Sequence, residues 1–336
     1  MSDAKHIAIA GATGAVGEEL LNCLAQRKFP IAKLTLLASA RSAGKTLPFG
    51  GEEIEVQELT MNSFEGVDIA LFSAGGGISK QFAPAAVAAG AVVVDNSSAF
   101  RMDEGVPLVV PEVNGEDAQN HDGIIANPNC TTIITLMGLN PLHRAFGGVT
   151  KIIASSYQAV SGSGASGILE LDAQLSAIAH GEPIPDRQVY LHQIANNVIP
   201  HVDVFTENGY TKEEMKMFHE GRKILHVPDL KASVTCVRVP VHRSHAVAVT
   251  AVFENEPDVD QARKAISAAP GVEVRDEPFA DPPIYPTPLD TTNGDDCLVG
   301  RIRRDLVLDN ALTFWVVGDQ VRKGAALNAV QIAELL

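Results

Sequence analysis

Cys130 is the residue whose surroundings in the sequence most favour covalent chemistry. It follows a turn at residues 127–129, which contains Pro128, and it precedes an apolar helical pattern over residues 133–139. A sulfur in the first turn of a helix lies beside backbone N–H groups whose dipoles favour the thiolate over the thiol. The sequence therefore predicts a nucleophilic cysteine at a helix start, whereas a lone cysteine out of context is more often buried and inert.

A histidine and an arginine in the second half of the chain supply further reactive groups. Two strand patterns, at residues 236–241 and 246–252, flank a turn that holds His242 and His245. Three positions apart in extended structure, the two histidines face opposite ways, so no metal site is predicted. A histidine can transfer protons near neutral pH, and an arginine such as Arg238 can bind a carboxylate through two parallel N–H hydrogen bonds. A purely structural role for either histidine is equally open.

Two other stretches carry polar groups at defined spacings. Thr211 and Glu214 form a capping-box pattern, which gives Glu214 a structural role at a helix start. Glu213 and Lys216 share one face of that helix and form either a surface ion pair, which is the commoner case, or a pair of ligand contacts. A loop rich in serine and glycine at residues 158–167 could admit a ligand against bare backbone.

The N-terminal stretch predicts a dinucleotide site. A strand at residues 7–10 runs into Gly11, Gly14 and Gly17, and residues 20–25 continue as a helix. Such a turn lets the backbone approach a pyrophosphate and points a helix N-terminus at it. The alternative is a plain tight turn.

The end of the second predicted strand, residues 34–38, favours NADP over NAD. No Asp or Glu follows that could bind a ribose 2′-hydroxyl, whereas an arginine with neighbouring hydroxyls can hold a 2′-phosphate. A solvated basic loop is the alternative. A later loop at the same sheet edge, residues 73–77, contains three glycines that allow close approach of a ligand to the backbone. Arg101, in the next such loop, is placed to bind an anion, and an ordinary surface arginine is the alternative. The groups after the second strand are Ser39, Arg41, Ser42 and Lys45.

Composition limits the class of protein. The 336 residues suffice for two domains, and the formal net charge of −15 argues against nucleic acid or an anionic membrane as a partner. The longest apolar run, at residues 83–94, is broken by Pro84 and Gly90 and is too short for a transmembrane helix. A signal-peptide pattern is lacking, so a cytoplasmic location is expected. The four cysteines form no C-x-x-C pair, so we expect reduced thiols and neither zinc nor a disulfide framework.

Strand and helix patterns alternate as far as residue 126, which predicts a βαβ domain with a parallel sheet. From residue 151 the pattern changes to that of an α+β domain. Strand patterns at residues 298–303 and 311–317 predict a hairpin, which is a candidate subunit interface. The last segment, residues 318–335, has a helical pattern and is expected to return to the first domain.

With these residues assembled, the chain resembles the aspartate-β-semialdehyde dehydrogenase family along nearly its full length. The order and spacing of the motifs make the resemblance specific. The motifs are GATGAVG at residues 11–17, NPNCTT at 127–132, QAVSGSG at 158–164, EEMKM at 213–217, RVPVHRSH at 238–245 and GAALNAVQIAE at 324–334.

The resemblance implies a role for each polar residue of the predicted site. Cys130 is the acylated nucleophile, Gln158 orients the intermediate and His245 is the acid/base. Arg238 engages the aspartyl carboxylate, and Glu213 engages the amine. The implied phosphate pocket consists of Arg101, Asn129 and Lys216.

The resemblance also implies an NADP site. Similar proteins usually carry Asp-Asn-Leu where this chain has Asp-Gln-Val at residues 319–321, so Gln320 is a candidate replacement for a nicotinamide contact. No metal is implied. The implied cofactor contacts are Gly11, Thr13, Gly14, Ala15, Val16, Gly17, Ser39, Arg41, Ser42, Ser73, Gly75, Ser161, Gly162 and Gln320.

The implied fold is α/β, with a Rossmann-type NADP-binding domain at residues 1–130 and 318–336 and an α+β catalytic and dimerisation domain with a mixed sheet at residues 131–317. The implied activity is NADPH-dependent reductive dephosphorylation of L-aspartyl-4-phosphate to L-aspartate-4-semialdehyde and phosphate through a cysteine thioester. It would serve lysine, diaminopimelate, methionine and threonine synthesis. The implied assembly is a homodimer or a dimer of dimers, with neither nucleic acid nor membrane as a partner.

Three alternatives remain open. An N-acetyl-glutamyl-phosphate reductase would perform the same reduction on another substrate, but it is expected to carry Gly-Cys-Tyr rather than Asn-Cys-Thr-Thr. A glyceraldehyde-3-phosphate dehydrogenase fits neither the first glycine motif nor the end of the second strand. An NADP-binding protein without catalysis is disfavoured because Cys130 and His245 are both present.

Overall fold

The computed structural model describes residues 4–336, so the first three residues of the predicted N-terminal domain lie outside it. The chain forms two compact units, which are described separately below. Unit 1 comprises the chain up to Asn129 together with Ala325–Leu336, and unit 2 comprises Cys130–Gly324. The chain therefore passes from one unit to the other immediately before Cys130.

Unit 1 is built on a seven-stranded sheet with the order β3-β4-β2-β1-β5-β6-β7. The neighbouring pairs are parallel, except that β3 and β4 form an antiparallel hairpin at one edge. The strands are β1 (Lys5–Ala10), β2 (Ile31–Ala38), β3 (Thr46–Phe49), β4 (Glu52–Glu58), β5 (Ile69–Phe72), β6 (Val92–Asp95) and β7 (Ile124–Ala126).

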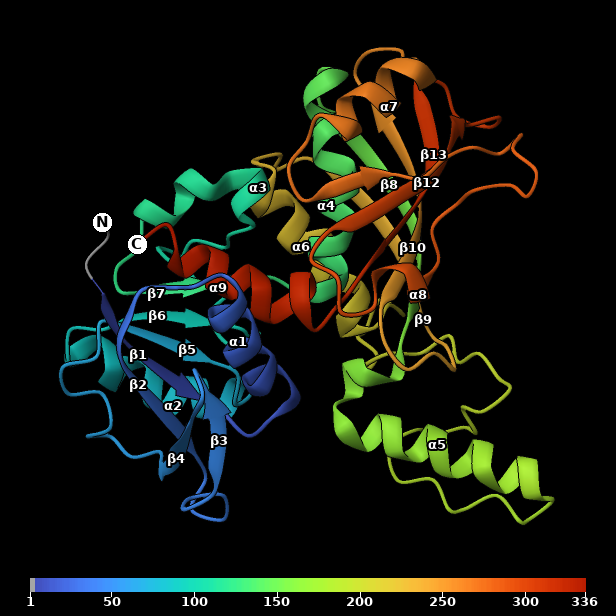
Figure 1. The fold of residues 1–336 in the computed structure, drawn as a ribbon. Helices are drawn as coiled ribbons and strands as arrows, with labels where there is room; N and C mark the ends of the chain where they lie inside the picture. The colour runs from blue at the N-terminus through green and yellow to red at the C-terminus, as the bar shows by residue number, and fades with distance from the viewer. Residues whose placement is uncertain (1–3) are drawn as a thin grey trace. The chain divides into compact units, whose positions relative to one another are not determined.

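Helices cover both faces of this sheet (Figure 1), because successive residues of a strand point to opposite sides. Ile7 and Ile9 of β1 pack in one apolar cluster with residues of α1 and α9, whereas Ala8 and Ala10 pack in another with residues of α2. A sheet buried on both faces explains the continuous apolar runs that predict its strands. The helices are α1 (Ala15–Gln26), α2 (Gly76–Ala88), α3 (Pro111–Asn114) and α9 (Leu327–Ala333), with a 3₁₀ turn η1 (Gly115–Gln119).

The β3–β4 hairpin is an element that the sequence patterns do not predict. Glu52, Glu53 and Glu55 of β4 are exposed and give this segment the composition of a loop. The hairpin register runs from Thr46 opposite Glu55 to Phe49 opposite Glu52, and it leaves β3 at the sheet edge. Edge strands tolerate charged side chains, so apolar content is a weak guide to them.

Unit 2 is built on a six-stranded sheet with the order β11-β12-β13-β10-β8-β9. The predicted mixed sheet is confirmed, because β8 is parallel to β9 and β11 to β12, while the other neighbours are antiparallel. The predicted hairpin at residues 298–303 and 311–317 is confirmed as β12 and β13. The strands are β8 (Val149–Gln158), β9 (Lys231–Arg238), β10 (His245–Phe253), β11 (Val272–Val274), β12 (Cys297–Arg304) and β13 (Ala311–Gly318).

One face of this second sheet is covered by helices and the other is open. Helix α4 (Cys130–Ala145) contacts β8, β10, β12 and β13, and α7 (Val259–Ser267) lies against α4 (Figure 1). Ile152 and Ala154 of β8 are buried, whereas the side chain between them, Ile153, is 52% exposed. The remaining helices are α5 (Ala165–His180), α6 (Lys212–Ile224) and α8 (Pro288–Thr291), with a 3₁₀ turn η2 (Val160–Ser163).

Helix α6 begins with the capping box that the sequence predicts. The backbone N–H of Thr211 donates to Glu214 Oε2 at 2.7 Å, and the backbone N–H of Glu214 donates to Thr211 Oγ1 at 3.3 Å. Each group satisfies a backbone donor that the helix start would otherwise leave unpaired. The prediction of a structural role for Glu214 is confirmed.

The helical prediction for residues 318–335 is wrong at its start. Strand β13 continues to Gly318, and helical geometry begins with the π-helical turn η3 (Arg322–Ala326). The Asp319 carboxylate accepts hydrogen bonds from the backbone N–H groups of Val321, at 2.9 Å, and Arg322, at 3.1 Å. An acidic side chain therefore caps the helical segment from the end of a strand, which periodicity does not reveal.

The predicted fold class, α/β with a second domain of α+β type, is confirmed. No helix within residues 4–336 combines the length and the apolar character needed to cross a membrane. In the same part of the chain, no three His, Cys, Asp or Glu side chains are grouped as ligands for a metal ion.

Candidate active site

Cys130 is the first residue of α4, as the sequence predicts, and its side chain is half-buried. The backbone N–H groups of the first helical turn have no intrahelical acceptors, so they favour negative charge at this position. Gly324 lies directly against the cysteine, because a Cβ added at residue 324 would be 2.8 Å from the Cys130 Cβ. The close packing around Cys130 therefore requires a glycine nearly two hundred residues away in the chain.

Strand pairing brings three of the predicted residues together at one end of the unit 2 sheet. Gln158, the last residue of β8, is paired with Arg238, the last residue of the parallel strand β9. On its other side β8 pairs antiparallel with β10, whose first residue is His245. Strand ends that meet in this way place an amide, a guanidinium and an imidazole side by side.

The peptide group of Ala159 connects the histidine to the arginine. Its N–H donates to His245 Nδ1 at 3.0 Å, and its carbonyl accepts a hydrogen bond from Arg238 Nη1 at 2.6 Å. A backbone N–H can only donate, so Nδ1 is the unprotonated ring nitrogen of a neutral imidazole. Nε2 is buried and has no hydrogen-bond partner within residues 4–336.

The electrostatic surroundings keep His245 uncharged. Complete burial lowers the pKa of His245 to about 3, with a further lowering by the Arg238 guanidinium and an opposing effect of the Glu213 carboxylate. Desolvation disfavours the charged form of a histidine, which is why burial acts in this direction. The imidazole is therefore neutral at physiological pH.

A second chain of contacts joins Gln158 to Lys216 through Glu213. Gln158 Nε2 donates to Glu213 Oε1 at 3.0 Å, and Lys216 Nζ lies 2.6 Å from Glu213 Oε2. Lys216 Nζ also contacts Asp203 Oδ2 at 3.4 Å. Glu213 is buried, so the pair that sequence spacing alone favours as a surface ion pair is part of a polar cluster.

Cys236 is close to the same cluster, but its thiol is unreactive. Burial, followed by the Glu213 carboxylate, raises the pKa of Cys236 to about 12, and the Cys130 sulfur acts in the same direction. A thiol with such a pKa stays protonated at physiological pH, and only the thiolate is an effective nucleophile. Since both Glu213 and Cys130 act on Cys236, the sulfur of Cys130 lies within electrostatic range of the cluster.

A cavity of about 210 Å³ lies beside Arg238. Ser163 belongs to the predicted serine- and glycine-rich loop, whereas sequence reasoning did not single out the remaining polar residues, because they lie in a loop-rich stretch without periodicity. Burial raises the pKa of Tyr190, one of these residues, so its hydroxyl is a hydrogen-bond donor in the physiological range. The polar lining residues are Ser163, Tyr190, His201, Asp203 and Arg238.

Gln320 connects two loops of unit 2. Its Nε2 donates to Ser161 Oγ, and its Oε1 accepts from the backbone N–H of Ser244 at 2.8 Å. Both functions of the amide are thus used next to His245, and the side chain is buried. These two hydrogen bonds have no signal in the sequence, where Gln320 stands out only as a departure from the family pattern.

Arg101 and Asn129 belong to unit 1. Arg101 Nε donates to the carbonyl oxygen of Asn127 at 2.9 Å, and Arg101 Nη2 donates to that of Asn96, also at 2.9 Å. These bonds hold the guanidinium against the loop that follows β6. The participation of Arg101 and Asn129 in a phosphate pocket with Lys216 stays a prediction.

The glycine turn of unit 1 has the shape that a dinucleotide pyrophosphate requires. Gly11 has φ +92°, and a Cβ at this residue would lie 2.9 Å from the carbonyl carbon of Ser73. A Cβ on Gly17 would overlap the carbonyl oxygen of Gly11. Gly14 and Gly75 precede α1 and α2 without any side-chain cap, so both helix starts keep N–H groups directed outward.

The loop after β2 carries the predicted 2′-phosphate residues Ser39, Arg41 and Ser42. The backbone N–H of Ser42 donates to the Ser39 carbonyl at 2.8 Å, which closes a turn at the strand end. Arg41 and Ser39 are exposed. An exposed guanidinium at this position is suited to a phosphate ester.

Comparison with known proteins identifies the relatives of this chain. Two family models match it: the NAD binding domain of semialdehyde dehydrogenase at residues 6–121 and the semialdehyde dehydrogenase dimerisation domain at residues 139–323. An aspartate-semialdehyde dehydrogenase of Aquifex aeolicus is 51% identical over 334 residues, which cover 98% of this chain and 97% of the relative.

Solved structures agree with this result. Aspartate semialdehyde dehydrogenase II of Vibrio cholerae, complexed with ASA, has a TM-score of 0.96 and 46% identity, covering 100% of this chain and 98% of that one. An aspartate semialdehyde dehydrogenase of Candida albicans with NADP has a TM-score of 0.77 and 26% identity, covering 99% and 98%. Each of these proteins is similar to this chain over nearly its whole length.

Proposed function

Since this chain belongs to the aspartate-semialdehyde dehydrogenase family, we propose that the polar cluster at the ends of β8, β9 and β10 serves a thioester formed on Cys130. The enzyme is an oxidoreductase that converts L-aspartyl-4-phosphate to L-aspartate-4-semialdehyde and phosphate in amino-acid biosynthesis. The observation that carries the proposed residue roles is the Ala159 peptide group, which binds His245 and Arg238 at the same time.

Binding of the aspartyl group uses charges that the free enzyme neutralises internally. Arg238 is assigned to bind the α-carboxylate of the aspartyl group, and Glu213 is assigned to bind its α-ammonium. In the structure Glu213 is paired with Lys216 at 2.6 Å. The ammonium of the incoming substrate replaces Lys216 as the partner of Glu213, and Lys216 then pairs with the acyl phosphate. Gln158 donates to the other oxygen of Glu213 and keeps the carboxylate oriented during this exchange.

Acylation is assigned to Cys130. The thiolate attacks the acyl carbon, the bond from carbon to the phosphate oxygen breaks, and a thioester forms. The first-turn N–H groups of α4 stabilise negative charge on the acyl oxygen in the transition state. Arg101, Asn129 and Lys216 are the groups proposed to hold the phosphate as it leaves.

The cofactor proposed is NADP. The glycine turn and the uncapped starts of α1 and α2 fit a pyrophosphate, and the exposed Arg41 supports binding of a 2′-phosphate. When bound, the reduced nicotinamide supplies the hydride that converts the thioester to the aldehyde. The remaining contacts proposed are Thr13, Ala15, Val16, Ser39, Ser42, Ser73, Gly75, Ser161, Gly162 and Gln320.

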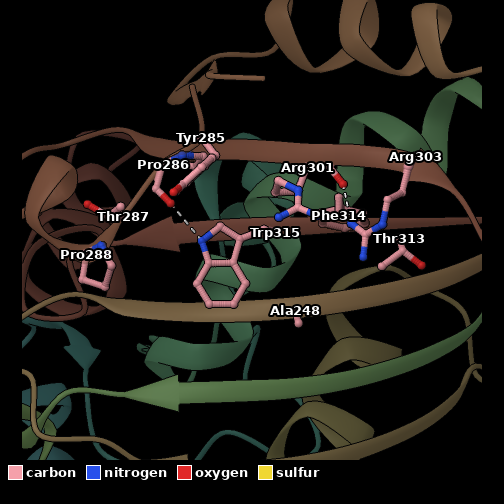
Figure 2. A pocket seen from close by; sticks show the side chains of 10 residues that line it. All are labelled: Ala248, Tyr285, Pro286, Thr287, Pro288, Arg301, Arg303, Thr313, Phe314 and Trp315. Carbon is pink, nitrogen blue, oxygen red and sulfur yellow. Dashed lines mark hydrogen bonds between the residues drawn. The ribbon is translucent and has the colours of Figure 1, made fainter. Parts of the chain in front are cut away.

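A homodimer is proposed on the open face of the unit 2 sheet, because a dimerisation family model matches residues 139–323. Strand register places Ile153 and Tyr157 of β8 on the same face as Trp315 of β13. The rings of Tyr157 and Trp315 are 5.3 Å apart. Figure 2 shows Trp315 in the wall of a pocket of about 320 Å³ on this face, where its Nε1 donates to the Pro286 carbonyl at 3.0 Å. Apolar and aromatic groups of this kind are typical of interface cores.

Substitution of the cysteine tests the proposed function. In Cys130→Ala we expect neither turnover nor the single-equivalent release of phosphate that accompanies acylation, because no nucleophile remains. Dinucleotide binding, followed by fluorescence, should persist because the glycine turn in unit 1 is unchanged. Cys236→Ala is the matched control and should retain turnover, since its thiol is buried and protonated. Turnover at the wild-type rate in Cys130→Ala would refute the proposal.

A further inference from the structure

Three asparagine side chains, Asn96, Asn127 and Asn328, are joined by hydrogen bonds inside unit 1 and form the asparagine network. Asn328, near the start of α9, donates from Nδ2 to Asn127 Oδ1 at 2.6 Å. Asn127 Nδ2 donates in turn to Asn96 Oδ1 at 3.0 Å. Asn96, which directly follows β6, donates from Nδ2 to the carbonyl oxygen of Phe72 at the end of β5, at 2.9 Å. The network thus links the last helix of the protein to the loops at the sheet edge (Figure 1).

Backbone carbonyls at both ends determine the direction of these hydrogen bonds. Asn328 Nδ2 also donates to the Val109 carbonyl at 2.9 Å, and a carbonyl oxygen can only accept. The Phe72 carbonyl orients the Asn96 amide in the same way, so Asn96 Oδ1 faces Asn127. Turning the Asn127 amide over would place its nitrogen against that of Asn328 and its oxygen against that of Asn96. Each of the three amides therefore has a single orientation.

The network lies mostly in the interior of unit 1. Asn328 and Asn127 are both buried, and Asn96 is partly buried. A buried amide oxygen that loses its donor costs free energy, because water does not replace the missing bond. A buried polar network whose members are satisfied holds them in one arrangement. The three side chains therefore restrict the backbone at residues 96 and 127.

The guanidinium of Arg101 is bonded to the backbone of two members of the network. Its Nε donates to the Asn127 carbonyl and its Nη2 to the Asn96 carbonyl, each at 2.9 Å. A guanidinium is planar and rigid, so two such bonds determine its plane. The bond between the side chains of Asn127 and Asn96 restricts the separation of the two carbonyls. The orientation of Arg101 therefore depends on the asparagine network.

We infer that Asn328 is a positioning residue for phosphate, because through Asn127 and Asn96 it fixes the guanidinium of Arg101. The inference rests on the proposed function, in which Arg101 helps to hold the phosphate. Asn328 is assigned no contact with phosphate, since it is buried and its Nδ2 donates to two protein oxygens. It acts on the reaction only through Arg101.

The competing explanation is that Asn328 only anchors α9 to the rest of unit 1. Other side chains also anchor this helix. Arg27 donates two hydrogen bonds of 2.6 Å to Glu334, which directly follows α9, and Gln331 Nε2 donates to Glu112 Oε1 at 2.8 Å. None of these four residues belongs to the asparagine network. Gln331→Ala is therefore a matched control, because it weakens the attachment of α9 and leaves the network in place.

Substitutions at two points of the network test the inference. Asn328→Ala removes the donor to Asn127, and Asn96→Ala removes the next acceptor but keeps the backbone carbonyl that accepts from Arg101. The assay is oxidation of the semialdehyde by NADP at varied phosphate concentration. We expect either variant to raise the KM for phosphate by about three- to tenfold and to change the KM for the semialdehyde and the Kd for NADP by less than about twofold. Gln331→Ala should change none of the three by more than about twofold.

The two variants keep the inference falsifiable even if one of them does not fold. Asn96 is only partly buried, so Asn96→Ala is the milder change. An unchanged KM for phosphate in either folded variant would overturn the inference. So would an equal rise in the KM for phosphate and the Kd for NADP, because general loosening of unit 1 would explain it.

A double-mutant cycle with Arg101 separates positioning from an independent effect. Arg101→Ala should raise the KM for phosphate by at least about tenfold, because a charged donor is lost. Adding Asn328→Ala to Arg101→Ala should raise it by less than about twofold more, since the group that Asn328 positions is already absent. Two effects that multiply in the double variant would show that Asn328 acts independently of Arg101, which would overturn the inference.

Failure of this inference can be distinguished from failure of the proposed function. If Arg101→Ala leaves the KM for phosphate unchanged, the proposed phosphate pocket is wrong, and the positioning role is overturned with it. If Arg101→Ala raises this KM but Asn328→Ala and Asn96→Ala do not, only the role assigned to Asn328 is wrong.

Discussion

The substitution Gly162→Ala gives a quantitative test of the geometry around Arg238 and His245. The added Cβ would lie 2.9 Å from Arg238 Nη1 and 3.3 Å from His245 Cε1, so the arginine must shift. This shift breaks the hydrogen bond that Arg238 Nη1 donates to the Ala159 carbonyl at 2.6 Å. A hydrogen bond that involves a charged group contributes about 1.5–3 kcal/mol, which corresponds to a decrease of about 10- to 150-fold in kcat/KM.

The assay is steady-state reduction of NADP in the presence of the semialdehyde and phosphate, with thermal unfolding measured on the same samples. We expect the decrease in kcat/KM together with a fall of a few degrees in the melting temperature, because the buried hydrogen bond that is lost also contributes to folding stability. Gly221→Ala is the matched control: its Cβ would make an ordinary contact, 3.6 Å from Leu230 Cδ2, inside α6. That variant should keep its activity and gain about 0.5–1 kcal/mol of stability from the higher helix propensity of alanine. Wild-type kinetics in Gly162→Ala would show that neither Arg238 nor His245 is placed as described.

Three further predictions concern the cofactor, the phosphate and the dimer. Arg41→Ala should lower kcat/KM for NADPH by about tenfold and leave that for NADH unchanged, because only the former carries a 2′-phosphate; equal changes for both would contradict this. Asp203→Asn removes a partner that lies 3.4 Å from Lys216, and since both side chains are partly exposed the KM for phosphate should fall by no more than about fivefold. A raised or unchanged KM would show that Asp203 does not compete with phosphate for Lys216. Ile153→Asp places a charge on the open sheet face and should weaken dimerisation by at least about tenfold, measured by light scattering against concentration; an unchanged mass at all concentrations would place the interface elsewhere.

Local patterns were sufficient for the elements whose structure depends on neighbouring residues. The helix start at Cys130 and the capping box of Thr211 and Glu214 were predicted and are confirmed. Both depend on hydrogen bonds and backbone preferences within one turn, which a few consecutive residues determine. The apolar strands of unit 1 were predicted for a related reason, since burial on both faces requires continuous apolar runs.

Local patterns did not predict a polar edge hairpin or the start of the last helical segment. The β3–β4 hairpin is charged on its exposed side, so it has no continuous apolar run, and its alternation is confined to two short strands in which Leu47, Phe49, Ile54 and Val56 face the core. The start of the last helical segment was misplaced because Asp319, the residue that follows β13, caps it. For this helical segment the signal is a hydrogen-bond partner rather than hydrophobicity.

The sequence by itself determined the residue types available for the chemistry: a cysteine at a helix start, a glycine turn after the first strand, and a histidine and an arginine seven positions apart. Only the tertiary structure decided their relation, because the register of β8 between β9 and β10 places the Ala159 peptide group between His245 and Arg238. That placement sets the tautomer of the histidine. It depends on contacts between residues 79 and 86 positions apart, and no local pattern specifies them.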